Sequence, residues 1–201
     1  MTIAPDLSNL PPGFADPARE SQTLFRAIMQ AVARPGRIAD LSTAPAPPPD
    51  LDIAAGAIAL TLADADAPVW LAPRLREGHT PAWLRFHCSA PIVMDPKACV
   101  FAFADAATAP PLSAFAQGEA RYPDRSTTLV LACDRLEGGP RVELSGPGIE
   151  TVETIAPQGL PAGFWAAWRD NGAQFPLGVD VMLVCGPKLA ALPRTTRARE
   201  L

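Results

Sequence analysis

The chain has 201 residues; 48% of them are hydrophobic, 19% are charged, and the formal net charge is −4. This length and composition suit one globular domain with a sizeable core and exclude wholesale disorder. The acidic balance argues against a general nucleic-acid binder, which would carry a basic face. Since the sequence has neither a signal-peptide pattern nor an apolar run near the ~18 residues of a membrane span, we expect a cytoplasmic protein without membrane contact.

Arginine greatly outnumbers lysine, with 15 arginines against Lys97 and Lys188. The guanidinium suits phosphate and carboxylate, but a high-GC coding bias gives the same excess, and we favour the bias. The cysteines have no C-x-x-C spacing and no histidine at metal-ligand spacing. The sequence therefore predicts no metal site and buried free thiols. The four cysteines are Cys88, Cys99, Cys133 and Cys185.

The first half of the chain alternates between helix and strand patterns. Residues 1–13 are polar and proline-rich and predict an extended arm, after which Asp16 and Pro17 can start a helix. Asp50 follows a proline-rich surface loop at 44–49 and can cap a buried helix. In chain order we expect a helix at 17–33, a strand at 38–41, a helix at 51–63, a strand at 69–71, a helix at 81–87, a strand at 100–103 and a short helix at 112–116.

The second half is richer in strands. We expect a turn at 121–126, strands at 128–133, 141–144 and 150–155, a helix that opens at Pro161, and a strand at 179–185. Residues 197–201 predict a polar tail, which leaves a single domain at 14–196. Alternating helices and strands, followed by β-β-β-α-β, predict an α/β layered sandwich with a mixed, largely parallel sheet.

The strand at 179–185 is apolar except for Asp180, so it is expected in the middle of the sheet with both faces covered. A carboxylate entering such a strand must be hydrogen-bonded, paired or at an exposed end. Shortly after it, a stiff turn at 192–196 carries Arg194 and Thr195, and arginine can hold a phosphate or carboxylate in two parallel hydrogen bonds. We expect a site at one end of this strand. We also expect Arg194→Lys to fold normally, because the turn loses no core contact.

The residues themselves form no recognisable catalytic constellation. The segment 145–148 is glycine-rich but lacks the rest of a phosphate loop, so a turn between strands is favoured. No G-x-S-x-G motif accompanies His79 or His87. Lys188 could form a Schiff base, but its turn setting favours a surface lysine. Arginines at element ends, Arg34 and Arg121 among them, could converge on an anion; capping and interface roles are the favoured alternative.

Several stretches together resemble one known family. They are Gly13-Phe14-Ala15-Asp16-Pro17, Ser21-Gln22 with Phe25-Arg26, Ala33-Arg34-Pro35-Gly36, Leu60-Thr61-Leu62-Ala63-Asp64, Val69-Trp70-Leu71, Tyr122-Pro123, Leu144-Ser145-Gly146-Pro147-Gly148-Ile149, Asn171, Phe175-Pro176-Leu177-Gly178-Val179-Asp180 and Leu192-Pro193-Arg194-Thr195-Thr196. In this order they resemble the PhnH family, the H subunit of carbon–phosphorus lyase, over nearly the whole chain. Arg125-Ser126-Thr127 departs from the strand entry usual in that family, so the resemblance implies no role for this turn.

The resemblance implies a fold similar to the large domain of pyridoxal-phosphate-dependent transferases, without the cofactor site and so without a cofactor. It implies a homodimer that joins the G, I and J subunits in a core complex. The G, H and I subunits, with the L subunit, displace adenine from ATP by methylphosphonate and form alpha-D-ribose 1-methylphosphonate 5-triphosphate. The J subunit breaks the carbon–phosphorus bond later by iron–sulfur chemistry, and this sequence has no cluster-binding motif for that step.

We therefore expect an accessory subunit that is not catalytic alone. Its candidates for anion binding or subunit docking are Arg34, Arg121, Asp180, Arg194 and Thr195. Trp83 and Phe86 look like exposed apolar residues that favour a homodimer. Two alternatives stay open, a stand-alone transferase of the pyridoxal-phosphate type and a non-catalytic scaffold. Binding of ATP or methylphosphonate to the isolated protein distinguishes a substrate-binding subunit from a scaffold.

Overall fold

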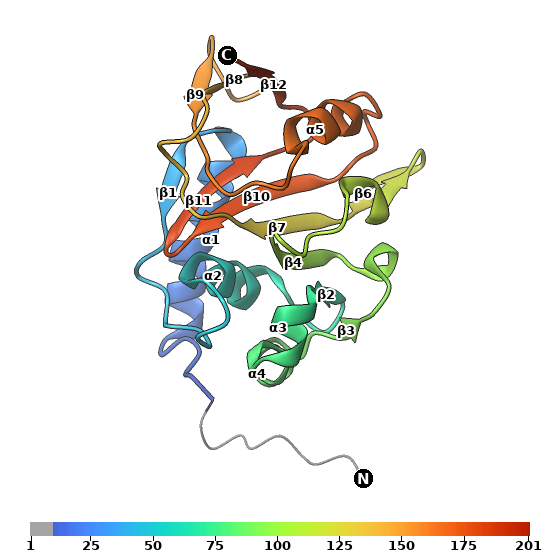
Figure 1. The fold of residues 1–201 in the computed structure, drawn as a ribbon. Helices are drawn as coiled ribbons and strands as arrows, with labels where there is room; N and C mark the ends of the chain where they lie inside the picture. Colours follow the sequence, from blue (N-terminus) through green and yellow to red (C-terminus); the bar gives the residue numbers. More distant parts are fainter. Residues whose placement is uncertain (1–9) are drawn as a thin grey trace.

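The computed structural model describes residues 10–201, which form a three-layer α/β sandwich (Figure 1). A seven-stranded sheet is the middle layer. Helices cover one face of this sheet, and a three-stranded sheet with one further helix covers the other. The expected layered sandwich with a mixed, largely parallel sheet is confirmed. Of the expected arm at 1–13, residues 1–9 lie outside the described residues.

The large sheet has the strand order β1-β11-β10-β7-β4-β2-β3. Strands β10, β7, β4, β2 and β3 run parallel to one another, while β11 pairs antiparallel with both β10 and β1. Their bounds are β1 Ile38–Asp40, β2 Val69–Leu71, β3 Ile92–Val93, β4 Phe101–Asp105, β7 Thr128–Ala132, β10 Asp180–Cys185 and β11 Lys188–Leu192. Strand β10 is therefore an interior strand, as expected.

Strand β10 contributes to an apolar core on each face of the sheet. Successive side chains of a strand point to opposite faces. Met182 and Val184 pack in the cluster formed with the helices, whereas Val181 and Leu183 pack in the cluster on the other face. Burial on both sides explains the nearly continuous apolar sequence of this strand.

Three helices supply most of the first outer layer: α1 Pro17–Ala33, α2 Ile53–Leu62 and α4 Thr80–Cys88, with the short α3 Pro73–Glu77 before α4. Helix α1 has the expected bounds, and the Asp16 carboxylate caps it by accepting from the backbone N of Arg19 at 3.3 Å. Ile28 is fully buried. Phe25 and Met29, on the same helix, are 45% and 38% exposed.

The other face is covered by helix α5 and by the sheet β12-β8-β9 (Figure 1). The bounds are β8 Val142–Ser145, β9 Glu153–Ile155, α5 Phe164–Gly172 and β12 Arg197–Glu200, with the short 3-10 helices η2 Pro96–Ala98 and η3 Leu112–Ala114. Phe164 and Trp168 of α5 are buried against Val142 and Leu144 of β8 in one apolar cluster. These two aromatic side chains therefore pack the core.

Three segments that were expected as turns or as a tail form strands instead. Residues 122–126 form strand β6 (Tyr122–Ser126), paired with β5 (Gln117–Glu119) as a hairpin and not as a turn. The sequence favours a turn around Lys188, but Lys188 begins strand β11. This strand forms because Gly186, at φ +54, and Pro187 make a two-residue turn that returns the chain along β10. Residues 197–200 are polar, as expected, but they form β12 and pair with β8.

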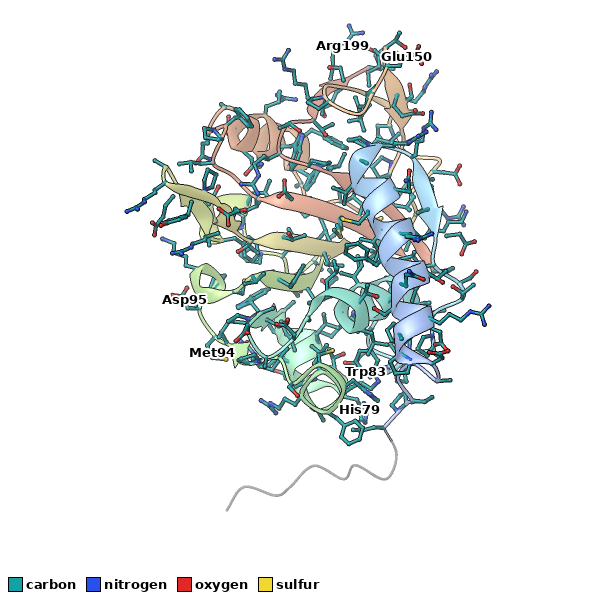
Figure 2. All side chains as sticks on the ribbon, turned by 180° about the vertical axis from the view of Figure 1, so that it is seen from behind. His79, Trp83, Met94, Asp95, Glu150 and Arg199 are labelled. Atoms are coloured by element: carbon teal, nitrogen blue, oxygen red, sulfur yellow. The ribbon has the colours of Figure 1, made fainter. Side chains whose placement is uncertain are left out.

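Asp50 was expected to cap a helix and Trp83 to be exposed, but both instead hold parts of the helical layer together. Asp50 does not cap α2; its Oδ2 accepts from the hydroxyl of Thr80 at 2.7 Å, where α4 begins. Trp83 is fully buried and donates from Nε1 to the carbonyl of Pro11 at 3.0 Å. Phe86, in contrast, is 59% exposed. Figure 2 shows Trp83 at the end of the molecule opposite Arg199.

Within residues 10–201, no helix combines the length and the apolar character that crossing a membrane requires.

Candidate functional site

Asp180 and Arg194 form an ion pair at the amino end of β10. The hairpin pairs Val181 with Leu192, so Asp180 lies beside the turn that follows β11. Arg194 donates from Nη2 to Oδ2 of Asp180 at 2.5 Å and from Nε to Oδ1 at 3.1 Å, and its backbone N donates to Oδ1 at 2.7 Å. The Arg194 side chain is 13% exposed and that of Asp180 is 32% exposed. This two-point contact fixes the orientation of the guanidinium.

The other hydrogens of the Arg194 guanidinium reach two more segments, strand β6 and the loop after α5. Nη2 donates to the hydroxyl of Ser126 at 2.5 Å, and Nη1 donates to the carbonyl of Pro123 at 2.9 Å and to that of Pro176 at 3.4 Å. A guanidinium has five N–H donors, and these contacts engage all of them. Arg194 therefore ties the turn after β11 to β6, to β10 and to the loop after α5.

Asn171 fixes the chain where it enters β10. Its buried side chain donates from Nδ2 to the carbonyl of Val179 at 3.0 Å and accepts at Oδ1 from the backbone N of Val179 at 2.8 Å. Gly178 has φ +117, and a Cβ added there would lie 2.9 Å from Oδ1 of Asn171. The end of α5 and the loop before β10 are thus one packed unit.

The turn at 145–148 packs between two other parts of the site. A Cβ added at Gly146 would lie 2.9 Å from the carbonyl oxygen of Thr195. A Cβ added at Gly148, at φ +83, would lie 2.2 Å from the carbonyl oxygen of Ala33, at the end of α1. The glycines therefore serve close backbone packing, in agreement with the turn expected between the two strands.

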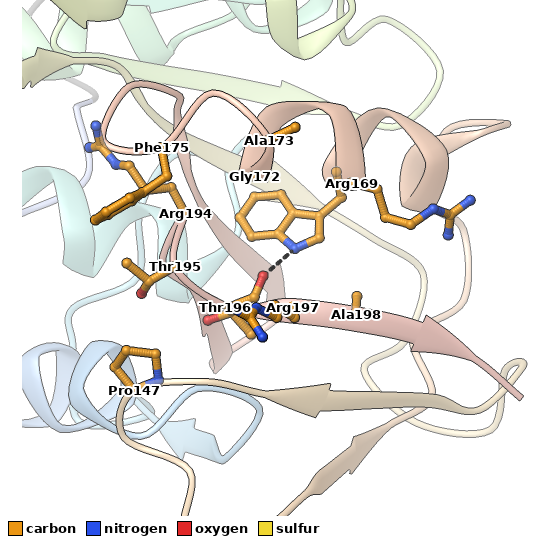
Figure 3. A pocket seen from close by; sticks show the side chains of 11 residues that line it. Pro147, Arg169, Gly172, Ala173, Phe175, Arg194, Thr195, Thr196, Arg197 and Ala198 are labelled. Atoms are coloured by element: carbon orange, nitrogen blue, oxygen red, sulfur yellow. Dashed lines mark hydrogen bonds between the residues drawn. The ribbon is translucent and has the colours of Figure 1, made fainter. Parts of the chain in front are cut away.

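An open cavity of about 570 Å³ lies beside this turn (Figure 3). The buried Trp168 lines it and donates from Nε1 to the carbonyl of Thr196 at 2.9 Å, the dashed line in Figure 3. Phe175 lines it with 62% of its surface exposed. Thr196 is 2% exposed, and its Oγ1 has no hydrogen-bond partner among residues 10–201. The other lining residues are Pro147, Arg169, Gly172, Ala173, Arg194, Thr195, Arg197 and Ala198.

The structure brings together three of the five predicted site residues, namely Asp180, Arg194 and Thr195. Arg34 lies elsewhere, exposed at the end of α1, with its backbone N bonded to the carbonyl of Gln30. Arg121 lies between β5 and β6, with its guanidinium 5.3 Å from the ring centre of Tyr122. Neither of these two arginines lines the cavity.

Neither lysine lies in a desolvated pocket. The side chain of Lys188 is 49% exposed and lies 3.7 Å from Glu137. Lys97 is exposed in η2. Both positions lack the apolar surroundings that make a lysine a useful amine nucleophile.

The four thiols are free, and three of them are buried. Burial raises the pKa of Cys88 to about 11 and is the main cause that raises the pKa of Cys133 to about 12. Such thiols stay protonated near neutral pH and react slowly. Within residues 10–201, no group of three or more His, Cys, Asp or Glu side chains is placed to hold a metal ion.

Sequence reasoning missed two contributors to the site. Ser126 fell in the segment expected as a turn, yet it is 8% exposed and accepts from Arg194. Arg197 fell in the expected tail. An alternation of polar and small residues in Arg197-Ala198-Arg199 is the one local signal that favoured an exposed strand there.

Fold and site together define an α/β domain with a mixed sheet. In it, the turn at 193–196, held by the ion pair of Arg194 with Asp180, borders an open cavity. The chain belongs to the PhnH family, described as a bacterial phosphonate metabolism protein, whose family model matches residues 12–199. The family expected from the sequence is thereby confirmed.

Two relatives agree with this family. The chain is 47% identical, over 185 residues and 92% of each chain, to "Alpha-D-ribose 1-methylphosphonate 5-triphosphate synthase subunit PhnH" of Rhizobium meliloti (strain 1021). It is 39% identical, over 79 residues, to "Putative C-P lyase subunit protein HtxG" of Stutzerimonas stutzeri, a match that covers 39% of this chain and 40% of that protein.

Proposed function

We propose that this chain is an accessory subunit of the complex that forms alpha-D-ribose 1-methylphosphonate 5-triphosphate during phosphonate catabolism. The observation that carries the proposal is the 47% identity to the Rhizobium meliloti synthase subunit over 92% of both chains. The second relative, named a putative carbon–phosphorus lyase subunit, supports the same system. In this reaction methylphosphonate takes the place of adenine on ATP.

The chain acts in the cytoplasm, and the reaction also needs the G, I and L subunits. The chain forms a homodimer, and it assembles with the G, I and J subunits in the core complex. These partners follow from the family. The mostly parallel sheet with helices packed on one face supports a likeness to the large domain of pyridoxal-phosphate-dependent transferases. The exposed setting of Lys188 and Lys97 supports a chain that has no use for that cofactor.

The role we propose for Arg194 and Asp180 is positioning. The donors of Arg194 all form hydrogen bonds within this chain, so the pair holds the turn at 193–196 in place. The residues after Arg194 then present their side chains to substrate or to a partner subunit. Arg34 and Arg121 are exposed and separate from this turn, which suits docking to other subunits.

Genetic complementation tests this function. A Rhizobium meliloti strain lacking its own PhnH subunit should grow on methylphosphonate as sole phosphorus source when this chain is supplied. Growth on inorganic phosphate is the control for general fitness. Failure of the folded chain to restore growth on methylphosphonate, with growth on phosphate intact, would contradict the proposal.

A further inference from the structure

We propose that the cavity beside Thr195 binds a phosphorus oxyanion, with Arg197 and Thr195 as its polar contacts and Phe175 against the rest of the ligand. The inference rests on the proposed function, in which methylphosphonate, ATP and the product each carry such an oxyanion. It assigns substrate contact to a residue that sequence reasoning placed in a tail. It also separates this contact from Arg194, whose guanidinium is engaged elsewhere.

Arg197 is the arginine whose charge is left free at this cavity. Its neighbours Arg194, Arg199 and Arg169 each form an ion pair; the partners are Asp180, Glu143 and Glu200, respectively. Arg197, in contrast, has no carboxylate within 4.0 Å among the described residues. No acidic side chain lines the cavity. The cavity therefore presents a net positive charge, and an anion is the complementary ligand.

The side chains in Figure 3 separate the free arginine from the paired ones. Arg194 and Arg169 extend away from Thr195, toward opposite sides of the view, in keeping with their ion pairs. Arg197 follows Thr195 and Thr196 at the start of β12, where it lines the cavity. Arginine at such a place can hold two oxygens of a phosphate or phosphonate group at once.

The turn adds hydroxyl groups beside this charge. Thr195 is partly exposed and lines the cavity. Thr196 lines it too, and its buried Oγ1 lacks a partner among residues 10–201. A buried hydroxyl without a hydrogen bond carries a desolvation cost, so a ligand oxygen or a ligand-bound water that reached it would remove that cost.

Phe175 gives the cavity an apolar side. Its ring is 62% exposed, with Pro147 and Ala173 also in the lining. Covering an aromatic ring that is mostly in water is favourable, so a ligand that packs on Phe175 would bind more tightly. The cavity volume of about 570 Å³ falls within the range typical of small-molecule sites. A ligand with an oxyanion at one end and an apolar or planar part at the other fits both features.

Calorimetric titration of the full-length chain, alone and in the complex that copurifies with it, tests this site. The probes are methylphosphonate, inorganic triphosphate and ATP, with adenine as the uncharged comparison. We expect at least one phosphorus compound to bind, and the compound that binds identifies which oxyanion the site takes. Arg197→Ala should weaken that binding by about tenfold or more. If ATP binds, Phe175→Ala should weaken ATP and leave triphosphate unchanged.

Arg199→Ala is the matched control, because it removes the same charge two residues further along β12, outside the cavity lining. It should change the affinity by less than about twofold. The inference is overturned if no phosphorus compound binds the wild-type chain in either form, or if Arg197→Ala and Arg199→Ala weaken binding equally. It is also overturned if Arg197→Ala abolishes copurification and leaves binding intact, since an acidic partner surface would then occupy the cavity.

Failure of this inference is distinguishable from failure of the proposed function. If Arg197→Ala leaves adenine release by the complex unchanged in both rate and substrate dependence, the cavity assignment fails and the subunit role stands. If the complex releases adenine fully without this chain, the proposed function fails, whatever the chain binds.

Discussion

The guanidinium of Arg194 holds the carboxylate of Asp180 at 2.5 Å across the amino end of β10, although the two residues are separated by the whole β10–β11 hairpin. The same guanidinium donates to Ser126 and to the carbonyl of Pro123 in β6. One side chain thereby joins the central sheet, the β5–β6 hairpin and the loop after α5. The position of Thr195, which lines the cavity, depends on this junction.

Arg194→Lys should destabilise the fold, in contrast to the normal folding that the sequence alone suggests. Lysine keeps the charge but cannot make the two-point contact with Asp180 and reach Ser126 and Pro123 as well. We expect the free energy of unfolding to fall by about 2–3 kcal/mol. Urea unfolding followed by tryptophan fluorescence measures it.

The control for this substitution is Arg199→Lys. Arg199 pairs with Glu143, but its side chain is 72% exposed. Since exposed ion pairs contribute little, this change should cost less than about 0.5 kcal/mol. Equal losses in the two variants would contradict the clamping role of Arg194.

The thiols should resist alkylation in the native protein. Burial raises the pKa of Cys88 to about 11, and burial with neighbouring negative charge raises that of Cys133 to about 12. Cys99 is also buried, and Cys185 is partly exposed with a raised pKa. Iodoacetamide at pH 8, followed by mass spectrometry of peptides, should label Cys185 first and the other three only after unfolding. Rapid native labelling of Cys133 would contradict the buried setting.

Asp52→Asn should stabilise the protein at pH 7. Burial raises the pKa of Asp52, against opposing effects of the Gly186 backbone and Arg74. A carboxyl whose folded pKa is raised contributes stability below its unfolded pKa of about 3.9, and that contribution is lost as the pH rises through the folded pKa. The advantage of asparagine should therefore be present at pH 7 and shrink near pH 3.

Urea unfolding at the two pH values measures this difference. A variant that is less stable than the wild type at pH 7 would mean that the backbone hydrogen bond at Gly186 outweighs the cost of burying the charge.

The purified chain should form a homodimer, as the family implies. Phe25, Met29 and Phe86 supply exposed apolar surface on α1 and α4 that an interface could cover. Light scattering at micromolar concentration should give twice the 21.2 kDa mass of one chain. A monomer mass under those conditions would contradict this prediction.

Local patterns predicted the elements whose signals are strong and short-ranged. Helix α1 has a cap at Asp16 and a proline stop at Pro35, so its bounds were predicted without error. Strands β2 and β10 are apolar because neighbours cover both faces, and both were found. Strand β12 was missed because it is polar and exposed, and its pairing with β8 is set by the tertiary fold.

Some residues of the site could be predicted from the sequence, but the contacts between them could not. Asp180 and Arg194 were singled out separately, each for its own chemistry. Their contact depends on β11: once Cys185 pairs with Lys188 across a two-residue turn, the register places Asp180 beside Pro193. The glycine and proline at 186–187 indicate a turn, but nothing local shows that a paired strand follows it. Ser126 and Arg197 depend on β6 and β12, two strands that the sequence reasoning did not include.

The most direct test of the subunit role is adenine release in a reconstituted reaction. Purified G, I and L subunits are incubated with ATP and methylphosphonate, with and without this chain, and free adenine is measured by chromatography. We predict adenine release only when the chain is present, and no release when methylphosphonate is omitted. Full release of adenine without the chain would contradict the proposed subunit role.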